Sequence, residues 1–287
     1  TDGLFDEFGE ERVIDTPLTE SQIVGTSIGA AIGGLRPIAE IQFADFIFPA
    51  MNQLLSEAAR MRYRSNNGFG VPMTVRAPYG GGVHGALYHS QSVESFFTHV
   101  PGLKVVVPST PYDARGLLRS AIRDDDPVLF FEHKKLYRSV RGEVPDEDYT
   151  VPLGQARISR PGDHVTVVAY GLMAHYALEA AELVEADGIS VEVIDLRTLR
   201  PLDRETLLGS VRKTGKCLVV YEDNRFGGYG AEVAAVVAEE AFEYLDGPVV
   251  RVAGPDVPGV PYAHALEDWF MIDPDRIATA VRRLAAY

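Results

Sequence analysis

A glutamate at the start of a predicted helix is the first side chain in this sequence that could perform acid–base chemistry. Glu20 opens a helical segment, predicted over 21–33, in which Gly25, Gly29 and Gly33 recur every fourth residue on one face. Interior glycines cost roughly 0.5–1 kcal/mol each relative to alanine, so a stripe of three indicates the close approach of another backbone, from a partner helix or a neighbouring strand. The spacing alone also allows ordinary packing, with Glu20 as a solvated acid that the helix dipole favours.

Histidines form the second group that could carry chemistry. His84 and His89 follow a glycine-rich turn, and His99 lies in the next predicted helix. No HExxH pattern and no paired cysteines accompany them, so a zinc site is not expected. Residues 80–85 match a dinucleotide-binding glycine pattern by letter, but no helix is predicted to begin there. A histidine ahead of a helix is usually a satisfied polar residue, and the residues alone leave a role as proton donor open.

Other features limit the function classes. The single cysteine, Cys217, lies in an apolar run without a basic neighbour and is expected to be a buried thiol. The formal net charge of −14 opposes binding to a phosphate backbone, so nucleic acid is not an expected partner. No apolar run approaches the roughly 18 residues that span a membrane. The acidic turn at Asp124, Asp125 and Asp126 is interpreted most simply as solvated.

An alternation of strands and helices must position these side chains. The 287 residues, of which 46% are hydrophobic, are enough for two domains with large cores. The apolar runs of the first half are continuous rather than alternating, which indicates a parallel sheet covered on both faces. The predicted strands there are 37–43, 73–77, 104–107 and 128–132, and the predicted helices are 21–33, 47–63, 93–100 and 112–123.

A break in this rhythm marks a domain boundary. Residues 141–153 contain Pro145, Pro152 and an acidic cluster without periodicity, which is typical of a linker. The sequence therefore predicts an α/β protein of two tandem three-layer α/β domains, over 1–140 and 154–287. In the second half the predicted strands are 165–170, 191–196, 218–222 and 249–253, and the predicted helices are 174–186, 204–212, 232–244 and a last one that begins at Asp273 and Pro274.

Nearly the whole chain resembles one protein family. Glu20 with the glycines after it, the run 34–46 (GLRPIAEIQFADF) and the run 84–92 (HGALYHSQS) are similar to the β subunits of thiamine-diphosphate-dependent 2-oxoacid dehydrogenases, the branched-chain type above all. The resemblance implies a transketolase-like pyrimidine-binding domain, followed by a transketolase C-terminal domain for assembly and for docking of the acyltransferase. It also implies an incomplete N-terminus, because the family has a strand and a helix upstream of Thr1.

The resemblance implies roles for individual side chains. Glu20 would hydrogen-bond ring nitrogen N1′ of the cofactor's aminopyrimidine and stabilise the imino form, whose exocyclic nitrogen removes the thiazolium C2 proton. Phe46 would pack against the pyrimidine, where branched-chain members often carry tyrosine, and Gln42 would lie beside the cofactor. His89 would face the cofactor and assist acyl transfer to a lipoyl group, by giving a proton to the opening dithiolane.

Metal ions and partner chains are implied in the same way. The cofactor's diphosphate needs Mg²⁺, and the sequence has no Gly-Asp-Gly motif, so an E1 α chain is expected to hold both in an α2β2 heterotetramer. A potassium site would use Asp124 and Asp126 together with the strand at Thr74. The second partner would be a lipoyl acyltransferase (E2). The expected location is the bacterial cytoplasm, or the mitochondrial matrix in a eukaryote.

The implied reaction is the oxidative decarboxylation of a branched-chain 2-oxoacid such as 3-methyl-2-oxobutanoate, with reductive acylation of the lipoyl group. Three alternatives stay open. Residues 108–114 and the phenylalanine at 46 also occur in pyruvate-type subunits, so pyruvate is an alternative substrate. A self-sufficient transketolase-like enzyme would need the missing diphosphate motif, and a non-catalytic assembly subunit would not need Glu20.

Overall fold

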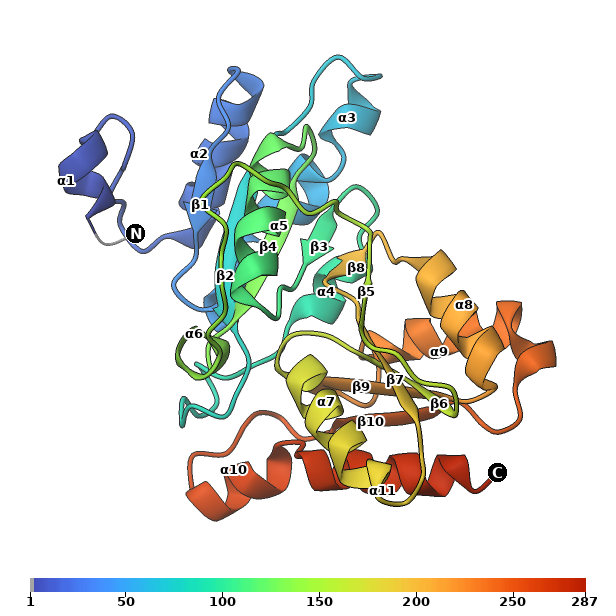
Figure 1. Ribbon diagram of the computed structural model, residues 1–287. Coiled ribbons are helices and arrows are strands. Elements are labelled where there is room, and N and C mark those ends of the chain that lie inside the picture. The colour runs from blue at the N-terminus through green and yellow to red at the C-terminus, as the bar shows by residue number, and fades with distance from the viewer. Residues whose placement is uncertain (1–2) are drawn as a thin grey trace.

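Two five-stranded sheets organise the chain, in a computed structural model that describes residues 3–287 (Figure 1). In the first sheet β1, β2, β4 and β3 run parallel, and β8 joins the edge antiparallel to β3. Strand β4 is buried along its whole length, which explains the continuous apolar run that predicted a parallel sheet. In sheet order the strands are Ile38–Glu40, Thr74–Tyr79, Val128–His133, Lys104–Val106 and Thr198–Arg200.

The second sheet repeats this plan. Strands β10, β9, β6 and β7 are parallel, and β5 lies antiparallel at the edge next to β7. Strands β6 and β7 are fully buried, including the acidic residues Glu192 and Asp195 of β7. In sheet order the strands are Val250–Gly254, Cys217–Asn224, Val165–Ala169, Val191–Asp195 and Arg157–Arg160.

Helices cover both faces of each sheet, so the predicted three-layer α/β architecture is confirmed. Helix α2 and the segment after β1 pack on one face of the first sheet, and α5 packs on the other. On the second sheet α7 and α11 share one core, while α8 and α9 pack on the opposite face. These helices are α2 (Glu20–Ile32), α5 (Pro111–Arg123), α7 (Leu172–Glu185), α8 (Arg204–Thr214), α9 (Gly230–Glu240) and α11 (Pro274–Ala285).

The two halves of the chain share one hydrophobic core. A single cluster of buried side chains extends from Val24 of α2 through both sheets to Val237 of α9. Strand β8 comes from the second half of the sequence but pairs with β3 of the first sheet. The predicted tandem order is therefore correct, but the domains are joined more closely than two independent units.

The helix predicted over 47–63 is not a regular α-helix in the structure. Residues 47–63 form one short 3-10 turn over Phe48–Ala50, a π-helical turn over Gln53–Ala58 and only then α3 (Met61–Arg64). Pro49 lies within the 3-10 turn and has no backbone N–H to donate. The short elements α1, α6, α10, β5 and β8 were not predicted, because segments of three to seven residues carry too little periodicity. The bounds of the remaining short α-helices are α1 (Leu4–Phe8), α4 (Glu94–Thr98), α6 (Leu136–Ser139) and α10 (His264–Phe270). Figure 1 shows α1 apart from both sheets.

The predicted linker is packed against α5 rather than extended into solvent. The guanidinium groups of Arg119 and Arg123 pair with Asp148 at 2.9 and 2.8 Å. Tyr149 stacks on Tyr112, with ring centroids 4.5 Å apart, and Val151 is buried in the core between α5 and the sheet. The acidic cluster that suggested a solvated tether therefore faces a row of arginines on one helix. No helix among residues 3–287 is long and apolar enough to cross a membrane.

The packing of residues 149–151 on α5 should leave no room for a side chain at Gly116. A Cβ at Gly116 would lie 2.5 Å from Val151 Cγ2 and 2.8 Å from Tyr149 Cε2, whereas around Gly209 in α8 no atom of the described chain lies within 4 Å of one. We expect Gly116→Ala to destabilise by about 1–3 kcal/mol through overpacking, despite the better helix propensity of alanine. The control Gly209→Ala should stabilise by about 0.5–1 kcal/mol. Thermal unfolding midpoints that move in the same direction would contradict this packing.

Candidate functional site

Three aromatic rings meet near the carboxyl end of the first sheet. The ring centroid of His89 lies 4.7 Å from that of Phe43 and 5.4 Å from that of Phe46, edge to face in both cases. Phe43 and Phe46 are 5.8 Å apart, also edge to face. The structure thus brings together Phe46 and His89, which the sequence proposed separately. Phe43 was not singled out, although its spacing from Phe46 in the run 34–46 was a usable signal.

Sheet topology explains why these rings meet. Phe43 and Phe46 lie in the loop and 3-10 turn after β1, and His89 lies in the loop after β2. Strands β1 and β2 are parallel neighbours, so the loops at their carboxyl ends lie side by side. This edge is where ligands bind in open parallel sheets. Edge-to-face contacts fix the orientation of each ring more firmly than apolar contact alone.

Glu20 is the first residue of α2 and is half-buried. The next residue ties the start of this helix to the site, because Ser21 Oγ donates a hydrogen bond to the carbonyl of Pro49 (3.0 Å). Pro49 lies three residues beyond Phe46, so the start of α2 packs against the segment that follows the aromatic rings. Gln42, the other residue implied to contact the cofactor, is exposed directly before Phe43.

The glycine stripe of α2 has no close backbone neighbour in the described chain. A Cβ at Gly25 would make only an ordinary contact of 3.8 Å with Gln53 Cγ, and one at Gly29 would meet no atom of residues 3–287 within 4 Å. Gly33 is the C-cap of the helix. The close approach of a neighbouring strand is therefore wrong as an explanation, and the approach of a partner helix stays a prediction.

Two buried carboxylates from the second domain hold the loop after β2. Glu222, at the end of β9, accepts a hydrogen bond from Gly81 N (2.6 Å) and pairs with His133 Nε2 (2.9 Å). Burial acts to raise the pKa of Glu222, but attraction to His133 and these hydrogen bonds keep that pKa below its ordinary value. Glu267 of α10 accepts from the backbone of Gly82 (3.1 Å). Sequence reasoning missed both glutamates, because nothing local to them shows which loop they reach.

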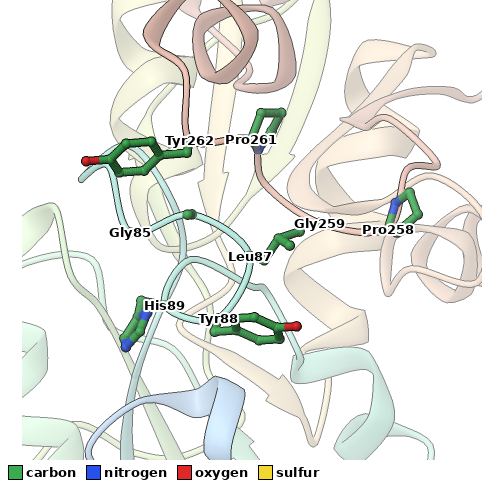
Figure 2. Close-up of a pocket in the computed structure, with 9 residues that line it drawn as sticks. Gly85, Leu87, Tyr88, His89, Pro258, Gly259, Pro261 and Tyr262 are labelled. Atoms are coloured by element: carbon green, nitrogen blue, oxygen red, sulfur yellow. The ribbon is translucent and has the colours of Figure 1, made fainter.

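A cavity of about 520 Å³ lies between this loop and a loop of the second domain (Figure 2). Apolar groups make up most of its wall. One side is the backbone and side chains of the loop that ends at His89, and the other is the turn before α10. The residues that line it are Gly85, Ala86, Leu87, Tyr88, His89, Pro258, Gly259, Pro261 and Tyr262.

Two further polar groups lie behind the aromatic rings. Lys134 Nζ is 5.6 Å from the ring centroid of Phe43, and burial lowers the pKa of this lysine to about 8. Burial raises the pKa of Asp45, whose Oδ1 accepts a hydrogen bond from Gln91 N (3.1 Å). Lys134 Nζ and Asp45 Oδ2 are both buried without a hydrogen-bond partner within the described chain. Each of these two side chains therefore carries a buried polar atom without a partner close to the aromatic rings.

A second pair of buried acids lies where the domains meet. Tyr170 donates a hydrogen bond to Glu94 Oε1 (2.8 Å), and Ser95 donates one to Asp223. Burial, with repulsion from Asp223 as a smaller cause, raises the pKa of Glu94 to about 8. Glu94 is 0% exposed, so it is expected to be protonated over much of the neutral range.

The acidic turn proposed for potassium is already paired with cations. Lys104 Nζ lies 2.6 Å from Asp124 Oδ2, and Arg62 Nε lies 2.5 Å from Asp126 Oδ1. Thr74 begins β2 in register with Val128, with its Oγ1 buried. In this arrangement both carboxylates are paired with cationic side chains, and the potassium site stays a prediction. In the part of the chain from residue 3 onward, no group of three or more His, Cys, Asp or Glu side chains could hold a metal ion.

Comparison with known proteins agrees with the fold. Residues 1–140 match the pyrimidine binding domain of transketolase, and residues 154–277 match the transketolase C-terminal domain. The chain is 59% identical over 287 residues to the 2-oxoisovalerate dehydrogenase subunit beta of Bacillus subtilis (strain 168), with 100% of this chain and 88% of that one covered. It is 49% identical over 280 residues to the pyruvate dehydrogenase E1 component subunit beta of the same organism, with 98% and 86% covered.

More distant matches extend this result. The 2-oxoisovalerate dehydrogenase subunit beta 2, mitochondrial, of Arabidopsis thaliana is 49% identical over 100% of this chain and 80% of that one. A solved structure described as a split gene transketolase, inactive beta4 tetramer, has a TM-score of 0.80 at 28% identity and covers 99% of this chain and 87% of that chain. The architecture is thus that of the transketolase-type thiamine-diphosphate enzymes. Within this class, the chain belongs to the family of 2-oxoacid dehydrogenase E1 β subunits.

The buried acid Glu94 should make stability fall as pH rises. Its pKa is about 8 in the folded chain against an ordinary value of 4.5, so the folded chain binds this proton more tightly than the unfolded chain. The stability that Glu94 contributes is complete below its unfolded pKa and is lost as pH rises through its folded pKa. Glu94→Gln should therefore become more stable relative to the parent between about pH 5 and about pH 8. Thermal midpoints would measure this, with the exposed Glu239→Gln as control. A difference from the parent that does not change with pH in Glu94→Gln would contradict it.

Proposed function

We propose that this chain is the β subunit of the E1 component of a branched-chain 2-oxoacid dehydrogenase complex, active only together with an α chain. The reaction is the oxidative decarboxylation of a 2-oxoacid such as 3-methyl-2-oxobutanoate, with transfer of the acyl group to the lipoyl group of an E2 acyltransferase. The observation that carries the proposal is the convergence of Phe43, Phe46 and His89 beside the start of α2, in a chain 59% identical to a 2-oxoisovalerate dehydrogenase β subunit.

The residues at this site fit an aminopyrimidine. The ring of Phe46 offers an apolar surface to a flat heterocycle, and Gln42 beside it is exposed and able to donate or accept a hydrogen bond. Glu20, half-buried at the start of α2, would hold a proton at ring nitrogen N1′. Bound thiamine diphosphate supplies the nucleophilic carbon and the electron sink that decarboxylation requires.

His89 would act in the second half of the reaction. It is exposed at the edge of the 520 Å³ cavity, where an incoming acceptor can reach it. Its imidazole would donate a proton to the dithiolane sulfur that leaves when the lipoyl ring opens. Contacts with Phe43 and Phe46 restrict the orientation of the imidazole, which reduces the entropy lost on reaching the reactive geometry.

An α chain would complete the site, in an α2β2 heterotetramer, by holding Mg²⁺ and the diphosphate. Large apolar side chains next to the site support a covering partner. Ile14 and Leu18, just before Glu20, are 71% and 76% exposed, and Tyr88 beside His89 is 67% exposed. Exposed apolar groups that gather around a functional site are typical of protein interfaces. The E2 acyltransferase would be the second partner. The names of the bacterial and plant mitochondrial relatives support the bacterial cytoplasm or the mitochondrial matrix as the location.

The substrate assignment can be tested with the assembled enzyme. We expect the chain, co-expressed with its α chain and supplied with thiamine diphosphate, Mg²⁺ and an artificial electron acceptor, to prefer 3-methyl-2-oxobutanoate over pyruvate by about tenfold or more in kcat/KM. The reason is that each methylene buried in an apolar pocket is worth a discrimination of this order. A preference for pyruvate would favour the second candidate, a pyruvate dehydrogenase β subunit, which the 49% identity to such a subunit supports.

The catalytic role of Glu20 separates this proposal from a non-catalytic assembly subunit. Glu20→Gln should lower decarboxylation in the assembled enzyme by about a hundredfold or more, because an amide cannot provide the proton-accepting carboxylate at N1′. The exposed neighbour Glu11 offers a control, and Glu11→Gln should leave turnover within about twofold of the parent. Unchanged turnover in Glu20→Gln would favour the assembly role.

A further inference from the structure

The loop that carries His89 is not stabilised by regular structure of its own. After β2 the backbone passes through φ angles of 87° at Gly80, 75° at Gly82, 55° at His84 and 54° at Ala86 before it reaches His89. The side chains of His84 and Ala86 disfavour this region of conformational space. Contacts from outside the loop must therefore stabilise its conformation.

Glu267 supplies such contacts from α10, near the far end of the chain. Its Oε1 accepts hydrogen bonds from the backbone N–H groups of Gly82 (3.1 Å) and His84 (3.2 Å), and its Oε2 contacts His84 Nδ1. The His84 ring also packs on the ring of His264, with centroids 3.9 Å apart. Glu267 is only 2% exposed, so losing these donors would leave a carboxyl oxygen buried without hydrogen-bond partners.

A second contact from the same segment holds the loop just before His89. Leu87 packs on Gly259, where an added Cβ would collide with Leu87 Cδ2. Figure 2 shows Leu87 pointing toward Gly259, while Tyr88 and His89 point in opposite directions. The segment 258–267 thus contacts the loop at two points, and His89 lies two residues after the second, Leu87.

Glu222 acts on a different part of the loop. It holds Gly81, at the base of the loop, and is itself backed by His133 and Ser92. Glu267 holds the turn at His84, which has positive φ and lies closer to His89 along the chain. Glu267 is therefore the carboxylate better placed to set the direction in which the loop leads to His89.

We propose that Glu267 is a positioning residue for His89. Through the N–H groups of Gly82 and His84 it fixes the loop so that the His89 imidazole packs on its aromatic neighbours and faces the acyl acceptor. This inference rests on the proposed role of His89 in acyl transfer. Glu267 acts through the loop and contacts no reacting group itself.

The test compares two rates in the assembled enzyme. Decarboxylation of 3-methyl-2-oxobutanoate is followed with an artificial electron acceptor, and reductive acylation is followed with an isolated lipoyl domain of E2. The variants are Glu267→Ala, Glu267→Asp, Glu267→Gln, His89→Ala and the double variant His89→Ala/Glu267→Ala. Asp268→Asn, an exposed acid on the same helix, is the matched control. Thermal midpoint and thiamine diphosphate affinity report on folding and assembly.

We expect Glu267→Ala to lower lipoyl acylation by about tenfold or more and decarboxylation by less than about twofold, because only acylation uses His89. Glu267→Gln keeps an oxygen for the two N–H donors and should stay within about threefold of the parent. Glu267→Asp shortens the side chain by one methylene, which moves the carboxylate away from the two N–H donors, so its acylation rate should resemble that of the alanine variant. The double variant should be no slower than His89→Ala, because two residues that act as a unit have non-additive effects.

Three results would overturn the inference. The first is acylation of the lipoyl domain at the parental rate by both Glu267→Ala and Glu267→Asp. The second is an equal fall of decarboxylation and acylation, and the third is a double variant that shows the product of the two single losses. Should Glu267→Ala fail to assemble, the aspartate and glutamine variants decide the outcome. His89→Ala with normal acylation would overturn the proposed function of His89 instead, so the two failures are distinguishable.

Discussion

Buried carboxylates of the second domain hold a loop of the first, and the geometry of the site depends on this contact. Glu222 is 5% exposed, yet it accepts a hydrogen bond from Gly81 N at 2.6 Å and pairs with His133 at 2.9 Å. These partners keep its pKa low although burial acts to raise it, so the group stays charged. A buried carboxylate that is shielded from water is stable only while its hydrogen-bond donors stay in place. The contact between Glu222 and the loop is therefore specific in distance and direction.

This constraint explains how a loop without regular structure can present a side chain with defined orientation. Phe43 and Phe46 are fixed by the strand and turn that precede them, since they follow a strand of the buried sheet. His89 comes from a loop whose backbone is stabilised from the other domain, and the three rings then pack edge to face. Rigid apolar packing supplies one side of the site and charged hydrogen bonds supply the other.

The second domain consequently contributes directly to the structure of the first. Strand β8 extends the first sheet, one hydrophobic core passes through both domains, and the acids Glu94 and Asp223 face each other across the boundary. A chain built in this way resists separation of its domains, because opening them would expose both apolar surface and buried polar groups. Apolar side chains remain exposed next to the site, at Leu18 and Tyr88.

The sequence by itself determined the two α/β domains, nearly all of the long helices and strands, and the local motifs around Glu20, Phe46 and His89, because periodicity, capping residues and short motifs are local properties. It did not determine the irregular turns over 47–63, the packing of 141–153 on α5, or the pairing of the acidic turn with Lys104 and Arg62. These features, together with the hydrogen bond that Glu267 accepts from His84 N, depend on contacts between residues far apart in the chain. Only the tertiary structure decided them, because such contacts depend on which buried groups must find partners once both sheets have packed.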